Sequence, residues 1–434
     1  MTSIVVKRSK LNGTVRCPSS KSYSHRAIAV ASLAYDQRST ITHLLMARDT
    51  LATLAGCGSL GAEIKYGATK VHIRGSDHFN PPENVINAEN SGTTIRILTA
   101  MSCLVTAGYT VLTGDESLRS RPMQPLLDSL RQLGVEAYST KANGTPPIIV
   151  KGGGIRGGTA LVDGSISSQF ISGLLIASIY ANSEVVIKVR GRLVSKPYVS
   201  ATLATMKHFG VSIDHNPDML EYYVQNARYR GTKFDVPSDF STAAIILAGG
   251  ALAGEKIRVN GLNFQMPQGD SRIVDILKIM GCRIKVDKEK GEVDITGAER
   301  LEGGDFDLAD TPDLLPVVSV LALKAANPVT ITGVAHARVK ETDRVSNIAV
   351  ELIKFGARIH EFRDGLKITA PTIIKNASLE AYNDHRLFMA FTIASMITEK
   401  SIVAGAQSVD VSYPNFILDL KNIGARISPA PDRE

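Results

Sequence analysis

The chain repeats one short pattern six times at nearly constant spacing, and this repeat constrains its fold more than any other feature. Each copy joins a helical apolar stretch to a bulky residue, a glycine, a small apolar residue and, two positions later, another apolar residue. The glycines, spaced by 73, 76, 71, 75 and 68 residues, are Gly61, Gly134, Gly210, Gly281, Gly356 and Gly424. Four residues before them stand Cys57, Leu130, Met206, Leu277, Leu352 and Leu420. The pattern predicts an amphipathic helix that ends at a left-handed glycine and is followed by a strand.

A second pattern runs at the same period and places a polar segment before each of six stretches rich in Ala and other small apolar residues. The polar starts are Ser20-Lys21-Ser22, Asn90-Ser91-Gly92-Thr93, Ser167-Ser168-Gln169, Asp239-Phe240-Ser241-Thr242, Asp310-Thr311-Pro312-Asp313 and Asn383-Asp384-His385-Arg386. Each contains residue types that cap helix N-termini. The stretches that follow are apolar on nearly every face, which predicts buried helices. Each repeat is therefore predicted to be an α/β unit with one buried helix, one surface helix and about four strands.

Six such units can form a ring, a solenoid or two groups of three. The length of 434 residues suits two or three domains. Two polar segments, residues 16–20 and 226–237, have the character of crossings between domains. They predict a first domain of residues 20–236 and a second domain of residues 1–19 plus 237–434, with three units in each.

The charge balance is mildly basic, with 49 Lys and Arg against 42 Asp and Glu and a net charge of +7. This balance suits anionic partners, either small phosphates or nucleic acid. The sequence has no lysine-rich tail and no run of five like charges, which disfavours nucleic acid. We expect no membrane segment, because no apolar stretch reaches the ~18 residues of a span. We expect a cytoplasmic protein, because the N-terminus lacks the basic-then-apolar order of a signal peptide.

Cations gather at the predicted helix starts and in the loops near them. They are Lys21, Arg26, Arg96, Arg121, Lys340, Arg344 and Arg386. Helix N-termini add free N–H groups and the positive end of a dipole, so they attract anions. If the six starts share one face, the cations match two substrates that carry phosphate and carboxylate groups, with roughly five to six negative charges together. The alternative interpretation is a set of unrelated surface charges and helix caps.

Carboxylates are interleaved with these cations. Asp313, Glu341 and Asp384 each lie within a few residues of a helix start or an arginine. A carboxylate enclosed among arginines can act as a general acid or base, with a pKa set by burial and by the positive field. The alternative for Glu341 and Arg344 is an ordinary ion pair on a helix surface.

Three other patterns carry little weight. Residues 56–61 fit G-x-G-x-x-G, but a helical stretch precedes them and a strand follows, which is the reverse of a dinucleotide-binding turn. The glycine-rich residues 151–158 lack the G-K-[ST] ending of a P-loop. The nine histidines and four cysteines show no spacing typical of a metal site or a thiol nucleophile, so we expect neither a metal nor another cofactor.

Longer motifs resemble those of the 5-enolpyruvylshikimate-3-phosphate synthase family, over essentially the whole chain. They are residues 18–26, residues 90–96, Arg121-Pro122, Ser167-Ser168-Gln169-Phe170, Ser195-Lys196-Pro197-Tyr198, residues 338–344 and Tyr382-Asn383-Asp384-His385-Arg386. The resemblance implies an enolpyruvyl transferase fold of two domains, each with three βαβαββ units in pseudo-threefold arrangement, an inside-out α/β barrel. It also implies an active site in the cleft between the domains.

The family's reaction joins shikimate 3-phosphate to phosphoenolpyruvate and releases phosphate, without a cofactor. Positions implied to hold shikimate 3-phosphate are Lys21, Ser22, Arg26, Ser167, Ser168, Gln169, Ser195, Tyr198, Asp313, His336 and Lys340. Positions implied to hold phosphoenolpyruvate are Lys21, Gly92, Arg121, Gln169, Arg344 and Arg386, with Asn90, Arg96 and Asp384 in support. The resemblance makes Asp313 the base for the attacking 5-hydroxyl and Glu341 the acid for the methylene carbon, with Lys21 and His385 also catalytic. It further implies inhibition by glyphosate, based on Gly92, and a monomer.

Two positions depart from the family pattern. Val411 stands where many members have a phosphoenolpyruvate-contacting Lys, and His336 stands where some have Asn. Two other functions remain as alternatives. The sister transferase that acts on UDP-N-acetylglucosamine usually has a Lys-Asn pair where this chain has Lys21-Ser22, and a reactive Cys that residues 112–121 lack. A phosphate- or RNA-binding protein without catalysis would not need Asp313 and Glu341.

Overall fold

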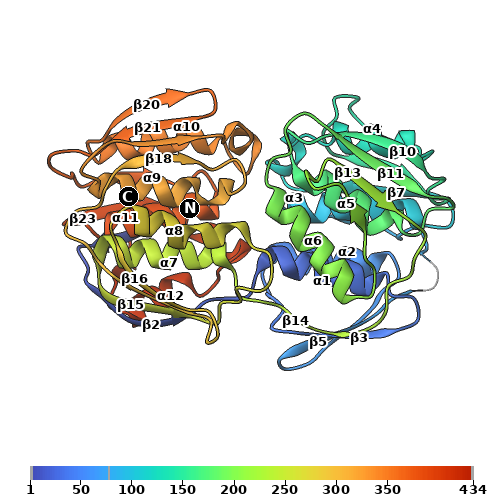
Figure 1. The fold of residues 1–434 in the computed structure, drawn as a ribbon, viewed down its shortest axis with the longest axis horizontal. Helices are drawn as coiled ribbons and strands as arrows, with labels where there is room; N and C mark the ends of the chain where they lie inside the picture. Colours follow the sequence, from blue (N-terminus) through green and yellow to red (C-terminus); the bar gives the residue numbers. More distant parts are fainter. Residues whose placement is uncertain (1–2, 77–78, 432–434) are drawn as a thin grey trace. The chain divides into compact units, whose positions relative to one another are not determined.

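The computed structural model describes residues 3–76 and 79–431. Contacts within the chain divide it into two compact units. The first unit is Ser19–Pro237, and the second unit is Met1–Pro18 together with Ser238–Glu434. Residues 19–237 run from blue to green in Figure 1, and residues 238–431 from yellow-green to red.

The first unit alternates strands and helices as the repeat predicts. Its helices are α1 (Lys21–Ser32), α2 (Arg48–Ser59), α3 (Gly92–Met101), α4 (Gln124–Gln132), α5 (Ser168–Ser178) and α6 (Lys196–His208). Its strands are β3 (Arg38–Thr42), β4 (Glu63–Tyr66), β5 (Lys70–Arg74), β6 (Ile86–Asn87), β7 (Tyr109–Thr113), β8 (Ala137–Ser139), β9 (Ile148–Lys151), β10 (Gly158–Asp163), β11 (Val185–Arg190), β12 (Asp214–His215), β13 (Glu221–Val224) and β14 (Lys233–Asp235).

The second unit has the same alternation, and its first two strands come from the N-terminus. Its helices are α7 (Phe240–Ala253), α8 (Ile273–Ile279), α9 (Leu315–Leu321), α10 (Arg344–Lys354), α11 (His385–Ser395) and α12 (Phe416–Asn422). Its strands are β1 (Ser3–Lys7), β2 (Leu11–Arg16), β15 (Gly254–Asn260), β16 (Arg283–Asp287), β17 (Glu292–Thr296), β18 (Gly304–Asp307), β19 (Val329–Thr332), β20 (Arg358–Phe362), β21 (Gly365–Thr369), β22 (Ser378–Glu380), β23 (Lys400–Ala404) and β24 (Arg426–Pro429).

The described strands form six four-stranded sheets, three in each unit. In the sheet β6-β7-β9-β8, β6 pairs with β7 in parallel and the other two pairings are antiparallel. The sheets of β10–β13 and of β18–β21 repeat this order and these directions. A βαβαββ segment thus builds one sheet, as the resemblance implies. The sheets are separate and form no closed barrel among the described residues, so the expected inside-out barrel is a set of open sheets around helices.

Strands are exchanged where the chain passes between units. β2 precedes α1 in sequence but pairs in parallel with β15, whereas β14 precedes α7 but pairs in parallel with β3. In the last sheet, β1 from the N-terminus lies between β23 and β24. It takes the place that β9 has in the sheet β6-β7-β9-β8. The chain therefore passes from one unit to the other at Pro18 and again at Pro237. The strand before each of these points, β2 or β14, is hydrogen-bonded into a sheet.

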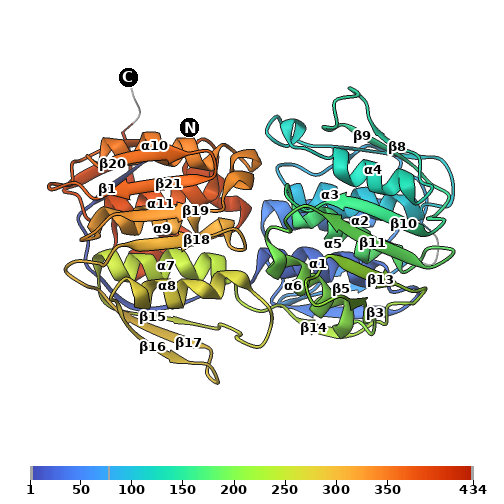
Figure 2. The same cartoon turned by 45° about the horizontal axis from the view of Figure 1, so that its top comes forward.

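One helix of each repeat is buried and the other covers the outside. All residues of α9 and α11 are buried, as are residues 240–252 of α7. These three helices contact one another pairwise and form the centre of the second unit's hydrophobic core. Figures 1 and 2 show them between the sheet of β20 and β21 and the sheet of β15, β16 and β17.

The predicted helix ends are confirmed in all six repeats. Gly61, Gly134, Gly210, Gly281, Gly356 and Gly424 all have positive φ, from +82° to +112°. The residue after each glycine donates its backbone N–H to the carbonyl five residues earlier, at 2.9 to 3.4 Å. This closes a Schellman motif on the predicted apolar positions, which are Cys57, Leu130, Met206, Leu277, Leu352 and Leu420.

Five of the six predicted N-caps also form. Ser20, Ser91, Ser167, Asp239 and Asp384 accept backbone N–H groups of the helices that follow them. The prediction for residues 310–313 was wrong in detail. Pro312 has no N–H, and the chain there makes a 3₁₀ turn, η4 (Pro312–Leu314), before α9 without a side-chain cap. No helix in the described ranges is long and apolar enough to cross a bilayer.

Candidate functional site

Three buried helices of the first unit begin at capping serines that leave polar groups at their N-termini. Ser20, Ser91 and Ser167 precede α1, α3 and α5. The serine hydroxyls accept only one N–H each at these ends, from Tyr23, Thr94 and Gln169 respectively. The remaining N–H groups and the helix dipoles favour an anion here.

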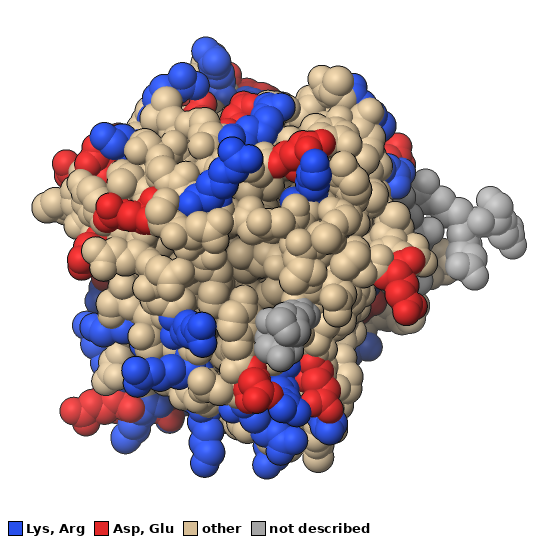
Figure 3. Space-filling model, turned by 90° about the vertical axis from the view of Figure 1, so that its right-hand side faces the viewer, with Lys and Arg blue, Asp and Glu red and all other residues tan. Residues whose placement is uncertain are grey.

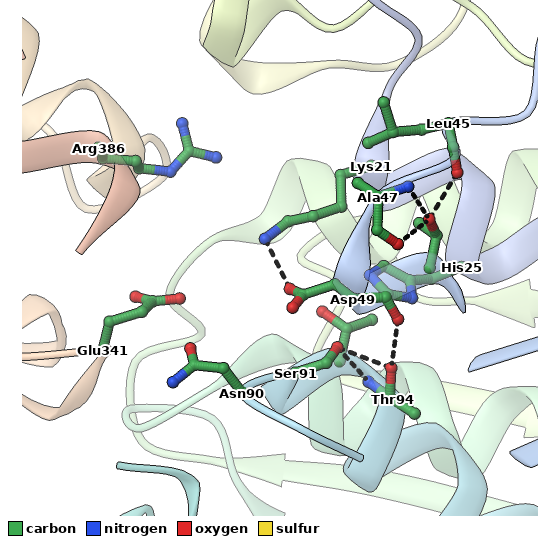
Figure 4. Close-up of polar contacts among 12 residues, drawn as sticks. Lys21, His25, Leu45, Ala47, Asp49, Asn90, Ser91, Thr94, Glu341 and Arg386 are labelled. Atoms are coloured by element: carbon green, nitrogen blue, oxygen red, sulfur yellow. Dashed lines mark hydrogen bonds and ion pairs between the residues drawn. The ribbon is translucent and has the colours of Figure 1, made fainter. Parts of the chain in front are cut away.

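Lys21, at the start of α1, is paired with a buried carboxylate. Its Nζ lies 2.9 Å from Oδ2 of Asp49 in the first turn of α2 (Figure 4). The two side chains are only 15% and 5% exposed, so little water screens the pair. Sequence analysis did not identify Asp49, because nothing in the local pattern separates it from an ordinary acidic residue in a helix's first turn.

Hydroxyl groups hold the helices behind this pair together. Thr53 Oγ1 lies 2.6 Å from His25 Nδ1 and 2.7 Å from Thr94 Oγ1. Thr94 donates to the hydroxyl of the cap Ser91 at 2.7 Å, and the hydroxyl oxygens of both threonines lie 3.3 Å from the backbone oxygen of Asp49. Burial, together with the nearby positive charges, lowers the pKa of His25 well below its ordinary value, so the ring is neutral. The network fixes α1, α2 and α3 relative to one another around Lys21 and Asp49.

Arg26 is a buried arginine of the first unit, and no carboxylate among the described residues pairs with it. Its three nitrogens bond to protein oxygens, including Thr202 Oγ1 at 2.7 Å and the backbone oxygens of Ser22 and Tyr198 at 2.9 Å. Burial lowers the pKa of Arg26 to about 10, which leaves the group cationic at neutral pH. Its guanidinium therefore holds two of the predicted substrate positions, Ser22 and Tyr198, and adds an uncompensated positive charge to the site.

Gly92 opens α3 between two arginines. A Cβ at this position would lie 3.2 Å from Nη1 of Arg96 and 3.2 Å from Nη1 of Arg121. Arg96 donates to Gln169 Oε1 at 2.7 Å and lies over the ring of Phe170. Arg121 donates to Asn90 at 2.9 Å. The structure thus brings five predicted residues together, and the missing side chain of Gly92 lets both guanidinium groups come close to the start of α3.

Ser168 and Ser195 occupy the starts of helices. Ser168 is the first residue of α5 and is buried. Ser195 precedes α6 with φ 56°, a left-handed conformation that is uncommon for serine. Such conformations concentrate at functional sites.

In the second unit, one buried arginine binds three carboxylates. Arg344 is 1% exposed and starts α10. Its Nε lies 2.7 Å from Asp384, its Nη1 2.8 Å from Asp313 and its Nη2 2.7 Å from Glu341. Burial alone would lower the pKa of Arg344, but the three carboxylates outweigh it and raise the pKa well above the ordinary value. The interpretation of Glu341 and Arg344 as a helix-surface pair is therefore wrong.

Asp313 is shared between two arginines. Its second oxygen lies 3.0 Å from Nη2 of Arg386, in the first turn of α11. Behind it lies Asp270 in η3 (Gly269–Arg272), which accepts a hydrogen bond from the Ser241 hydroxyl and has no partner for its other oxygen. Burial, with the charge of Asp313, raises the pKa of Asp270 to about 7, although Arg386 opposes this shift. Sequence analysis missed Asp270, since only the fold brings it beside Asp313.

The remaining predicted residues of the second unit lie near these groups in sequence. His336 is buried in η6 (Ala335–Val339), and Lys340 follows it directly. His385 is the buried first residue of α11. Val411 is buried at the end of η7 (Ala406–Val411), so this position offers no cation. No cluster of three potential metal ligands occurs in residues 3–76 and 79–431.

The fold is that of the enolpyruvyl transferases. The structure titled enolpyruvyl transferase NikO from Streptomyces tendae matches 99% of this chain and 99% of that chain, with TM-score 0.77 and 17% identity. An EPSP synthase structure from Acinetobacter baumannii matches 99% of this chain and 100% of that chain, with TM-score 0.82 and 26% identity.

The family follows from the sequence comparisons. The family model described as EPSP synthase (3-phosphoshikimate 1-carboxyvinyltransferase) matches residues 5–420. A 3-phosphoshikimate 1-carboxyvinyltransferase of Nitrosopumilus maritimus is 42% identical over 424 residues, covering 98% of this chain and 99% of the relative. One of Methanocaldococcus jannaschii is 43% identical over 427 residues, covering 98% of each. The chain belongs to the EPSP synthase family.

Proposed function

We propose that the chain transfers the enolpyruvyl group of phosphoenolpyruvate to the 5-hydroxyl of shikimate 3-phosphate and releases phosphate. This is the sixth step of chorismate and aromatic amino-acid biosynthesis. The observation that carries the proposal is that Asp313 and Glu341 are held on different nitrogens of one buried arginine. Two carboxylates fixed side by side but separately can act as base and acid in one reaction.

The cations supply the binding energy for two anionic substrates. In this proposal shikimate 3-phosphate is held by Lys21, Ser22, Arg26, Ser167, Ser168, Gln169, Ser195, Tyr198, Asp313, His336 and Lys340. Phosphoenolpyruvate is held by Lys21, Gly92, Arg121, Gln169, Arg344 and Arg386. The assignment requires residues of both units to reach the same pair of substrates. It is supported by the buried charge of Arg26 and by the close approach of Arg96 and Arg121 to Gly92.

The reaction proceeds by addition and elimination. Glu341 gives a proton to the methylene carbon of phosphoenolpyruvate, and the electron-poor C2 is attacked by the 5-hydroxyl, whose proton passes to Asp313. The tetrahedral intermediate then loses phosphate, which takes up the proton held by Asp313, and the methyl group loses a proton that returns to Glu341. The arginines hold both anions in line and stabilise the phosphate as it leaves.

The ion pairs of Arg344 suggest how Glu341 becomes an acid. Glu341 pairs with Nη2 of Arg344 at 2.7 Å, which keeps its carboxylate ionised. When the carboxylate or phosphate of phosphoenolpyruvate takes this nitrogen, Glu341 loses this ion-pair partner. A carboxyl group released from the pair can take up the proton that the reaction needs.

We further propose a cytoplasmic monomer that needs no cofactor and is inhibited by glyphosate. The glyphosate proposal rests on Gly92, where a Cβ would press against Arg96 and Arg121. The proposal of small anions rather than nucleic acid as partners is supported by the surface. Figure 3 shows Lys and Arg interspersed with Asp and Glu around a largely uncharged central area on this face. A nucleic-acid-binding surface gathers Lys and Arg instead.

Phosphate release tests the function directly. Purified protein is incubated with phosphoenolpyruvate, with and without shikimate 3-phosphate. We expect release only when both are present. Release without shikimate 3-phosphate, or none with both despite a folded protein, would contradict the proposal. The variant Glu341→Ala should lose turnover but keep binding of shikimate 3-phosphate.

A further inference from the structure

The turn that leads into α11 has an uncommon backbone. Tyr382 and Asn383 have φ of 53° and 57°, and two consecutive non-glycine residues in this region are unfavourable. The next residue, Asp384, caps α11 through Arg386 N–H at 2.8 Å and Leu387 N–H at 3.3 Å. It also pairs with Arg344. A turn of this kind persists only where its surroundings hold it.

A buried carboxylate holds the turn. Glu351, on α10, is fully buried. Its Oε1 accepts the Tyr382 hydroxyl at 2.8 Å, and its Oε2 accepts the backbone N–H of Glu380 at 3.0 Å. Lys354 supplies the counter-charge, with Nζ 2.8 Å from each oxygen. These contacts compensate the carboxylate for the loss of water. Each of its oxygens also accepts a hydrogen bond from residues 380–382, where the turn begins.

The Tyr382 hydroxyl remains a donor over the working pH range. Burial, and then the hydrogen bond to Glu351, raises the pKa of Tyr382 to about 12. The phenol is therefore protonated at neutral pH, and the bond to Glu351 is a charge-assisted one.

One helix thus holds both ends of the segment. Arg344 and Glu351 are seven residues apart on α10, which places them on one face about two turns from each other. Arg344 bonds to Asp384 at the end of the turn, and Glu351 bonds to Glu380 and Tyr382 at its beginning. Movement of the turn along α10 would break both sets of bonds.

We infer that Glu351 is a positioning residue for phosphoenolpyruvate binding. Through Tyr382 and the Glu380 amide it fixes the turn, and the turn fixes Asp384 against Arg344 and places Arg386. This inference rests on the proposed function, in which Arg344 and Arg386 bind phosphoenolpyruvate. If Glu351 had only a structural role, its loss would lower stability and affect the binding of both substrates alike. If it has a positioning role, its loss mainly weakens the binding of phosphoenolpyruvate.

The test compares two single-bond variants with a matched control. Tyr382→Phe removes only the hydroxyl that Glu351 accepts, and Glu351→Gln keeps one acceptor oxygen but loses the charge. The control Lys278→Gln breaks an exposed ion pair with Asp275 on α8 of the same unit. Steady-state kinetics gives kcat and the KM of each substrate, binding of shikimate 3-phosphate is measured alone, and thermal unfolding gives Tm.

For Tyr382→Phe and Glu351→Gln we expect the KM of phosphoenolpyruvate to rise about tenfold, as a small misplacement of binding groups costs that order. The dissociation constant of shikimate 3-phosphate should change less than threefold, on the order of a lost exposed contact, and Lys278→Gln should resemble the unmodified chain. An unchanged KM of phosphoenolpyruvate in both variants, with or without a lower Tm, would overturn the inference. An equal effect of Lys278→Gln would overturn it too. Absence of turnover in the unmodified chain would refute the proposed function, and this inference with it.

Discussion

Asp384 and Arg344 form a two-bond ion pair that is almost completely excluded from water. Nε of Arg344 lies 2.7 Å from Oδ2 of Asp384, and Nη2 lies 3.3 Å from Oδ1. The side chains are 0% and 1% exposed. The same carboxylate caps α11. One acidic residue therefore pairs with the arginine that also binds Asp313 and Glu341, and it fixes the helix that carries Arg386.

Replacing Asp384 by Ala should lower the free energy of unfolding by about 3–5 kcal/mol, because buried Arg344 loses one of its three carboxylate partners and α11 loses its cap. The matched control is Asp343→Ala, since Asp343 caps α10 but pairs with Arg338 in a partly exposed position. The control should cost about 1 kcal/mol for the lost cap. Urea unfolding measures both. Equal losses in the two variants would mean that burial of the Arg344 pair adds nothing.

Asp270 should make stability depend on pH. Its pKa is raised to about 7 in the folded chain, whereas an unfolded Asp titrates near ~3.9. The folded state therefore holds a proton that the unfolded state releases, and the chain loses stability as pH rises from about 4 to about 7. Asp270→Asn cannot ionise, so its stability relative to the unmodified chain should increase over this range.

The measurement is urea unfolding of both proteins at pH 5 and pH 8. Asp275→Asn, which removes a carboxylate from the exposed side of α8, serves for comparison. A difference between Asp270→Asn and the unmodified chain that is the same at both pH values would show that Asp270 does not titrate in this range.

Asp49 should matter for turnover through Lys21. Asp49→Asn removes the charge that holds Nζ of Lys21 at 2.9 Å. A lost bond between charged groups in a buried position costs about 1.5–3 kcal/mol, so kcat/KM should fall roughly 10- to 100-fold. Glu89→Gln is the control, because it breaks the ion pair of Arg48 at the same end of α2 in an exposed position. A loss of similar size in the control would argue against a specific role of Lys21 and Asp49.

Gly92→Ala should separate the inhibitor from the substrate. Its methyl group would lie 3.2 Å from a nitrogen of Arg96 and from a nitrogen of Arg121, so one of them must shift. We expect the KM of phosphoenolpyruvate to rise about tenfold, glyphosate inhibition to weaken, and the KM of shikimate 3-phosphate to change little. Gly58→Ala is the matched control, since the nearest atom to its new methyl group is 3.8 Å away. An unaltered response to glyphosate in Gly92→Ala would remove the basis for that proposal.

The local signals in the sequence predicted local structure well. A glycine after an amphipathic helix predicts the end of the helix, because glycine adopts a left-handed φ without steric cost. All six of these glycines have positive φ. Ser and Asp before apolar runs predicted five caps for the same kind of reason. At residues 310–313 no side-chain cap forms, because the chain makes a 3₁₀ turn in which the Leu314 N–H donates to the backbone oxygen of Thr311 instead. The strand exchange of β2 and β14 had no local signal, since pairing partners lie more than 190 residues apart.

The charged residues show the same division. The sequence determined which residues carry charge, where helices begin and end, and, through its motifs, the family to which the chain belongs. Only the tertiary structure decided that one buried arginine pairs with Asp313, Glu341 and Asp384. The same holds for the pair of Asp49 with Lys21 and for the hydrogen bond of Glu351 to Tyr382 in the turn before α11. Helix caps depend on residues within one turn, whereas a buried charge takes its partner and its pKa from whatever the fold packs against it.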